Sequence, residues 1–200
     1  MPSSPFEMVG QPLNLWLAPV GTAFPLINVA PSGSWTNIGT SGTSSQDEAG
    51  VTATHSQTLN KVRTGGTTGA RKVFRSEEDL DFKVTIFDIS LEQVRLALNG
   101  NTLTTVAAST GVAGTKRLGL TRGFDVTEYA LLARGPSPYA DAMNLQYQVP
   151  RCYMAGSPAL VYRKGVPVGV ELMFTALEDP NAASVDLRFG SLLAQHQAPL

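Results

Sequence analysis

The sequence predicts a mainly β protein, an antiparallel β-sandwich or barrel with one flanking α-helix at about residues 90–99. Its 13 prolines and 19 glycines indicate many short strands and turns. Hydrophobic residues make up 42% of the chain and charged residues only 16%, which argues against disorder. A chain of 200 residues most naturally forms one domain, so we expect a single domain over residues 1–200.

Strands are indicated wherever apolar and polar residues alternate. The runs LDFKVTIF (80–87) and VGVELMFTA (168–176) each place their apolar side chains on one face. GFDVTEYALLA (123–133) begins with the same alternation. The threonine-rich run from Val51 to Val62 favours an extended strand partly clear of a core. YRKGVPV (162–168) is typical of a hairpin turn.

The segment DISLEQVRLALNG (88–100) predicts the helix. Ser90 is a suitable N-cap, and Gln93 three residues later matches the capping-box pattern. A helix of about ten residues is not stable alone in water, so we expect it to pack on the sheet. Its expected apolar stripe consists of Leu91, Val94 and Leu98.

The glycine-rich stretch KVRTGGTTGARKVF (61–74) raises the question of a phosphate-binding loop. Such a loop requires G-x-x-x-x-G-K-[ST] followed by a helix, because the helix N-terminus supplies the amides that bind the anion. No Ser or Thr follows Lys72, and the next segment is a predicted strand. We therefore interpret the stretch as a flexible hairpin tip.

No pattern in the sequence indicates an enzyme, a metal site or a cofactor. His55 and His196 are the only histidines, and neither H-E-x-x-H nor G-x-S-x-G occurs. Cys152 is the only cysteine, which excludes an intrachain disulfide and a multi-cysteine metal cluster. The acidic run SEEDLD (76–81) lacks the spacing of a calcium loop, although acid pairs from distant segments stay open.

The composition also bears on partners and location. A formal net charge of −1 does not suggest a protein that binds nucleic acid by neutralising phosphates. The longest apolar region, residues 13–31, is interrupted by prolines, so we expect no membrane insertion. The N-terminus lacks a signal-peptide pattern, and we expect synthesis in the cytosol. The low charge favours a surface covered by neighbouring subunits.

Charge is unevenly distributed along the predicted hairpin, where five basic residues and no acid lie between Lys61 and Arg75 and acids follow directly. One interpretation is a solvated hairpin of mixed charge. The other is a basic tip that docks on an acidic surface of an identical subunit, a contact that builds a filament if it does not close. The hairpin residues are Lys61, Arg63, Gly65, Gly66, Gly69, Arg71, Lys72 and Arg75, and the acidic counter-surface is Glu77, Glu78 and Asp79.

In their order along the chain, these features resemble the tail tube (major tail) proteins of long-tailed, non-contractile bacteriophages of the siphovirus type. The resemblance spans nearly the whole chain, and its specificity lies in the succession of its motifs. These are LNLWLAPVGTAFP (13–25), GSWTNIGTSG (33–42), the hairpin reaching NKVRTGGTTGARKVF (60–74), LDFKVTIFDISLEQVRLALNG (80–100) and GVPVGVELMFTALEDPN…FGSLLAQ (165–195).

The resemblance implies a structural virion protein that forms hexameric rings, stacked head to tail into the hollow tube through which the genome passes. It implies the chain itself, a tape measure protein and a tail terminator as partners, and a location in the virion tail. The hairpin 61–75 would reach the neighbouring ring, and residues 1–10 and 192–200 would be arms that order on assembly.

The resemblance also implies a lining of the tube. DNA that must slide is not held by an acidic or neutral lumen, because like charges repel. The candidates for lumen-facing acids are Asp125, Glu128 and Glu171.

Three other functions remain open at this point. The first is the tube protein of a related bacterial injection machine or gene-transfer particle. The second is a monomeric β-sandwich binding module, for which Trp16 and Trp35 give little support as exposed aromatic platforms. The third is an enzyme, which the missing catalytic patterns disfavour.

Overall fold

The structure is a computed structural model that describes residues 8–139 and 142–196. It is mainly β, with antiparallel strands over 44% of the residues and helix over 7%. This confirms the predicted antiparallel β fold with one flanking α-helix. The N-terminal residues 1–7 and the C-terminal residues 197–200, which belong to the two expected arms, lie outside the described residues.

The main sheet has eight strands in the order β2-β1-β7-β8-β9-β4-β3, with β10 pairing with β8 off this path. A second sheet contains only β5 and β6. The strands are β1 (Asn14–Pro19), β2 (Thr36–Asn37), β3 (Gln46–Val62), β4 (Lys72–Ile86), β5 (Leu103–Val106), β6 (Thr115–Leu118), β7 (Glu128–Pro136), β8 (Asn144–Met154), β9 (Val170–Ala176) and β10 (Ser191–Ala194). The helices are α1 (Leu91–Ala97) and the 3-10 turns η1 (Gly42–Ser45) and η2 (Val185–Leu187).

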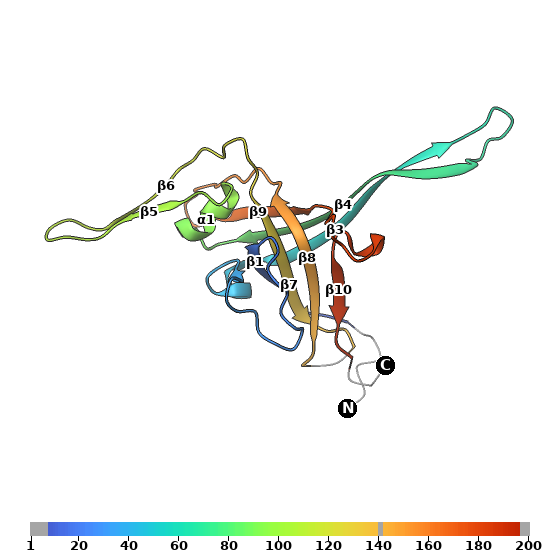
Figure 1. Cartoon of the computed structure of the whole chain (residues 1–200). Coiled ribbons are helices and arrows are strands. Elements are labelled where there is room, and N and C mark those ends of the chain that lie inside the picture. The colour runs from blue at the N-terminus through green and yellow to red at the C-terminus, as the bar shows by residue number, and fades with distance from the viewer. Residues whose placement is uncertain (1–7, 140–141, 197–200) are drawn as a thin grey trace.

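Strand β8 joins the two halves of the main sheet, one containing β2, β1 and β7 and the other containing β9, β4 and β3. One edge of β8 pairs with β7, while the other pairs with β10 over residues 145–148 and with β9 over residues 152–154. Figure 1 shows β7, β8 and β10 running from top to bottom of the view, while β3, β4 and β9 cross them from side to side. The two halves enclose one main apolar core, to which β1, β4, β7, β8, β9 and α1 all contribute.

The alternation predicted for residues 80–87 is confirmed. Leu80, Phe82, Val84 and Ile86 are at most 5% exposed and point into the main core. In β9 the apolar side chains at alternate positions are fully buried beside them, with Phe82 paired to Phe174 and Val84 to Leu172. Each such side chain contributes about 1.5–3 kcal/mol relative to an exposed one.

The predicted helix is present, but the prediction of a capping box is wrong. Ser90 precedes α1 without capping it through its side chain. The side chain of Gln93 is instead buried, with its Oε1 accepting from Gly39 N at 3.1 Å. The helix therefore turns Gln93 and Ala97 toward the protein, rather than the expected stripe of Leu91, Val94 and Leu98. The Gln93 side chain therefore bonds to Gly39, 54 residues away in the sequence, instead of to the start of its own helix. The local sequence does not reveal such a distant partner.

The C-terminal segment was expected to be an arm from Leu192 onward. Leu192–Ala194 instead belong to β10 and pair with β8. Gly190 makes this approach possible, since its φ is +111° and an added Cβ would lie 1.9 Å from the carbonyl oxygen of Gln148. The described part of this segment is therefore integrated into the sheet.

We expect Gly190→Ala to lower the free energy of unfolding by about 2–3 kcal/mol, because the new methyl group would force β10 away from β8. Gly111→Ala is the matched control, since Gly111 also has positive φ but open space around its Cβ position. It should cost only about 1 kcal/mol. Urea unfolding of both variants checks this, and equal losses would contradict the assigned contact.

The connection into α1 is held by Asp88. Its Oδ2 accepts from the backbone N–H of Thr40 at 2.8 Å and from the Thr40 hydroxyl, and its Oδ1 accepts from Ser90 N at 3.0 Å. Partial burial alone would raise the pKa of Asp88, but the hydrogen bonds from Thr40 and Ser90 outweigh it and lower the pKa to about 2.

This depressed pKa predicts a pH-dependent contribution to stability. The folded state binds the proton more weakly than the unfolded chain, so the contribution is complete above the usual value of 3.8 and is lost as the pH falls through about 2. The stability difference between the native protein and Asp88→Asn should therefore be largest at neutral pH and shrink in acid. Urea unfolding across this range measures it, and a difference independent of pH would refute the assignment.

Candidate functional site

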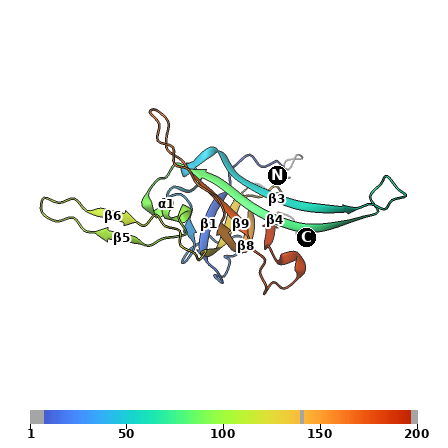
Figure 2. The ribbon, with the colours of Figure 1, turned by 90° about the horizontal axis from the view of Figure 1, so that it is seen from above.

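The most prominent surface feature is the hairpin formed by β3 and β4, which projects far from the body of the protein (Figures 1 and 2). All side chains from Thr52 to Asp79 are exposed, and the core begins only at Leu80. An isolated two-stranded ribbon is marginally stable in water. Its length therefore indicates a role outside the subunit's own core.

The end of this hairpin is an open turn. Arg71 N donates to Val62 O at 2.9 Å and closes the loop, and Thr67 N donates to Thr64 O at 3.1 Å. A strand follows the turn, so the helix that a phosphate-binding loop requires is missing from this place. The loop carries Arg63, Gly65, Gly66, Gly69 and Arg71 of the predicted hairpin residues, while Lys61, Lys72 and Arg75 lie on its strands.

The two faces of the hairpin follow from its register. We call the face of β3, β4 and β9 that continues the main core the core-side face, and the opposite one the outward face. An irregularity after Thr58 leaves Ser76 without a partner, so Thr58 pairs with Glu77 but Leu59 pairs with Arg75. Beyond this bulge, the core-side face carries Leu59, Lys61, Val73 and Arg75, and the outward face carries Asn60, Val62, Lys72 and Phe74.

Both faces of the projecting part thus expose apolar side chains. Leu59 and Val62 are 44% exposed, and Val73 and Phe74 are 47% and 49% exposed. The ammonium group of Lys72 lies 4.8 Å from the centre of the Phe74 ring, a cation–π contact. A ribbon of this kind presents apolar and basic groups together to any partner.

The three residues of the predicted acidic counter-surface lie on two different faces of β4. Glu78 lies on the core-side face, where its carboxylate is 3.1 Å from the guanidinium of Arg75. Glu77 and Asp79 lie on the outward face, and Glu77 accepts from the Thr58 hydroxyl at 3.1 Å. The three acids follow one another along β4 and therefore alternate between faces. They do not form one surface, contrary to the expectation.

Of the three candidate lumen acids, Glu171 and Glu128 share the outward face of the body. The pairings Thr85–Glu171, Asp81–Thr175, Tyr153–Thr175 and Glu128–Tyr153 place them there. Each has a basic partner: Lys83 Nζ lies 2.8 Å from Glu171, and Arg151 holds Glu128 at 2.8–2.9 Å. Among the described residues, Glu77, Asp79 and Asp81 make no ion pair, so the outward face carries an excess of acid along β4.

Asp125 is placed differently, and here the predicted strand is wrong. β7 begins only at Glu128, and the segment 119–127 before it is irregular. Phe124 is fully exposed and Val126 is 61% exposed. Side-chain amides hold this segment: Asn99 donates to the carbonyls of Arg122 and Asp125 at 2.9 and 2.7 Å and accepts from Thr127 N. Asn101 adds bonds to the carbonyls of Gly119 and Thr121 at 2.8 Å.

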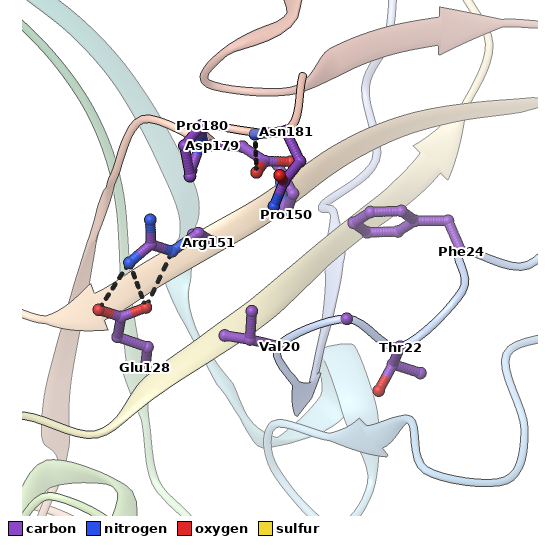
Figure 3. Close-up of a pocket in the computed structure, with 10 residues that line it drawn as sticks. Val20, Thr22, Phe24, Glu128, Pro150, Arg151, Asp179, Pro180 and Asn181 are labelled. Carbon is purple, nitrogen blue, oxygen red and sulfur yellow. Dashed lines mark hydrogen bonds and ion pairs between the residues drawn. The ribbon is translucent and has the colours of Figure 1, made fainter. Parts of the chain in front are cut away.

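An open hollow of about 530 Å³ lies beside the Glu128–Arg151 ion pair. In Figure 3 the two charged groups meet from neighbouring strands at one end, with Asp179, Pro180 and Asn181 above them and Phe24 on the far wall. The lining residues include no histidine, cysteine or serine. This hollow therefore combines apolar side chains, one ion pair and the carboxylate of Asp179.

The ionisable groups with shifted pKa values serve the fold. Burial raises the pKa of the Cys152 thiol and of the Tyr129 hydroxyl. Burial lowers the pKa of Arg134, whose guanidinium donates to Gln146 Oε1 and to the carbonyls of Val29 and Leu26. These bonds tie the segment after β1 to β7 and β8.

The part of the chain described here contains no group of three or more His, Cys, Asp or Glu placed to hold a metal ion. In the same residues, no helix is long and apolar enough to cross a membrane.

Sequence reasoning missed a second projecting hairpin, formed by β5 and β6. It points away from the body on the side opposite to the β3–β4 tip in both views (Figures 1 and 2). The strands have only four residues each and are joined through Gly111 and Gly114. Short alternation around two glycines is the signal that could have revealed it.

A scan against protein-family models finds no match to this chain, and a search of the curated proteins likewise finds no match.

The role of Asn99 leads to a prediction. Asn99 has a φ of +63°, which glycine adopts without strain, so Asn99→Gly removes the side-chain bonds alone. We expect amide hydrogen exchange in residues 119–127 to accelerate roughly 100-fold, because the side chain of Asn99 makes three hydrogen bonds to this segment and each contributes about 1 kcal/mol. Exchange in β8 is the internal control. Unchanged exchange in 119–127 would show that Asn99 does not hold the segment.

Proposed function

We propose that this chain is a structural tube protein, whose copies form hexameric rings that stack into a hollow tail tube for genome delivery. The proposal rests chiefly on one observation. The projecting part of the β3–β4 hairpin, from Thr52 to Asp79, carries basic and apolar side chains that are exposed and lie outside the subunit's own core. A second copy of the chain offers a surface on which such a ribbon can be buried.

The edges of the main sheet support self-assembly. Its path ends at β2 on one side and at β3 on the other, so both ends have an unpaired edge within the described chain. Open edges invite strand pairing between molecules, and closing them into a continuous barrel removes this liability. Pairing between neighbouring copies would join the inner strands of the ring.

The outward face of the body is a suitable lining for such a tube. It presents hydroxyl groups of β3 and paired charges, and its remaining unpaired charge is acidic, at Asp81 and its neighbours. The main core covers the other side of the same strands. DNA would therefore meet a polar surface that repels phosphates rather than one that binds them.

The proposal is tested first by negative-stain electron microscopy of the purified protein over a range of concentrations and salts. We expect rings or tubes. A protein that stays monomeric under every condition would contradict the proposed function.

A sharper test reverses the charge of the hairpin tip. Arg71→Glu combined with Lys72→Glu should change the free energy of unfolding by less than about 0.5 kcal/mol, because both side chains are exposed. Assembly should nevertheless stop or give much shorter tubes. Arg163→Glu combined with Lys164→Glu, on the exposed turn between β8 and β9, is the matched control. Tubes of unchanged length in the first variant would exclude the docking role of the tip.

A further inference from the structure

The β5–β6 hairpin has one face turned to its own subunit and one face free. On the inner face, Leu103 and Leu118 are half-buried, and Lys116 forms an ion pair with Glu92 of α1. On the outer face, Thr104 pairs with Arg117 and Val106 with Thr115. Val106 is 61% exposed, and Arg117 makes no ion pair within the described residues. The outer face therefore presents one apolar and one basic group.

The outward face of the β3–β4 ribbon carries the complementary groups. Asp79 and Glu77 near its root have no basic partner among the described residues. Phe74 is the first apolar side chain on this face beyond the bulge, and Val62 follows one position nearer the tip, where it pairs with Lys72. Both are half-exposed. Going from root to tip, an acidic patch is thus followed by an apolar one.

The spacing of the two patterns also agrees. Diagonal cross-strand neighbours such as Val106 and Arg117 lie about 7 Å apart. Glu77 and Phe74 pair with Thr58 and Asn60, which are two residues apart on β3, so their positions along the ribbon also differ by about 7 Å. An arginine and a valine of one hairpin can therefore meet an acid and an aromatic ring of the other together.

Charge also selects the direction of the contact. Lys72 lies beside Phe74 at the tip end of the apolar patch. Arg117 placed toward the tip would meet this like charge, whereas Arg117 placed toward the root meets Glu77 and Asp79. One register is favoured and the reverse register is opposed.

We propose that the outer face of the β5–β6 hairpin docks on the outward face of the β3–β4 ribbon of a second copy of this chain. Arg117 contacts Glu77 and Asp79, and Val106 packs on Val62 and Phe74. Within one subunit the two hairpins point in opposite directions, so the partner is another molecule (Figures 1 and 2). The contact joins two different surfaces and repeats head to tail.

This inference rests on the proposed self-assembly but assigns a new element and a different partner to the acidic patch. It covers Glu77 and Asp79 at the root of the ribbon. It leaves Asp81 and the ion-paired Glu128 and Glu171 uncovered on the outward face of the body, where they can line a lumen. The basic tip of the ribbon is then free to contact a further surface.

A charge swap tests the contact. Arg117→Glu alone, and Glu77→Lys with Asp79→Lys alone, should each weaken assembly about tenfold at low salt. Combining the three changes should restore it, as followed by sedimentation and electron microscopy. The double variant Glu77→Lys, Asp79→Lys can also be combined with Arg71→Glu and Lys72→Glu. Rescue by this second combination, and not by Arg117→Glu, would overturn the proposal.

Cross-linking gives a second readout. Val106→Cys and Phe74→Cys are prepared as separate variants and mixed with a flexible bis-maleimide, the native Cys152 being buried. The mixture should give a covalent dimer, and each variant alone should not. If the native protein forms tubes but the mixture gives no cross-link and the charge swap gives no rescue, this contact is refuted and the proposed function stands. Absence of any assembly by the native protein refutes the proposed function itself.

Discussion

The packing of β4 against β9, within the core enclosed by the turned sheet, is the interaction on which the rest of the structure depends. Phe82 and Phe174 are almost completely buried at its centre, and Leu172 and Val84 pack beside them. A shift of one residue in β4 would move this apolar set to the outside. The core therefore sets the register of β4 and determines which of its acids face outward.

Because this core ends at Leu80, the remaining length of β3 and β4 leaves the subunit without support. The bulge after Thr58 then separates an acidic root from an apolar and basic tip on the outward face. The β5–β6 hairpin projects on the opposite side with Arg117 and Val106 exposed. Both hairpins expose apolar and charged groups away from the core of their own subunit, which is the physical basis for proposing a self-assembling protein.

Elements with strong local patterns were predictable. The alternation of residues 80–87, the threonine-rich β3 and the turn at Lys164 all correspond to strands or turns in the structure. Where the prediction failed, a distant partner had intervened. Gln93 bonds to Gly39 instead of capping its own helix, and Asn99 holds residues 123–127 as coil although they alternate like a strand.

By itself, the sequence determined the fold class, the existence of α1 and the charged, glycine-containing hairpin, since these depend on neighbours along the chain. Only the tertiary structure decided that Glu77 takes the outward face and Glu78 the core-side face, that Leu192–Ala194 join the sheet and that a second hairpin opposes the first. Faces and edges are properties of strand pairing. They arise from contacts between residues far apart in the chain, where local patterns carry no information.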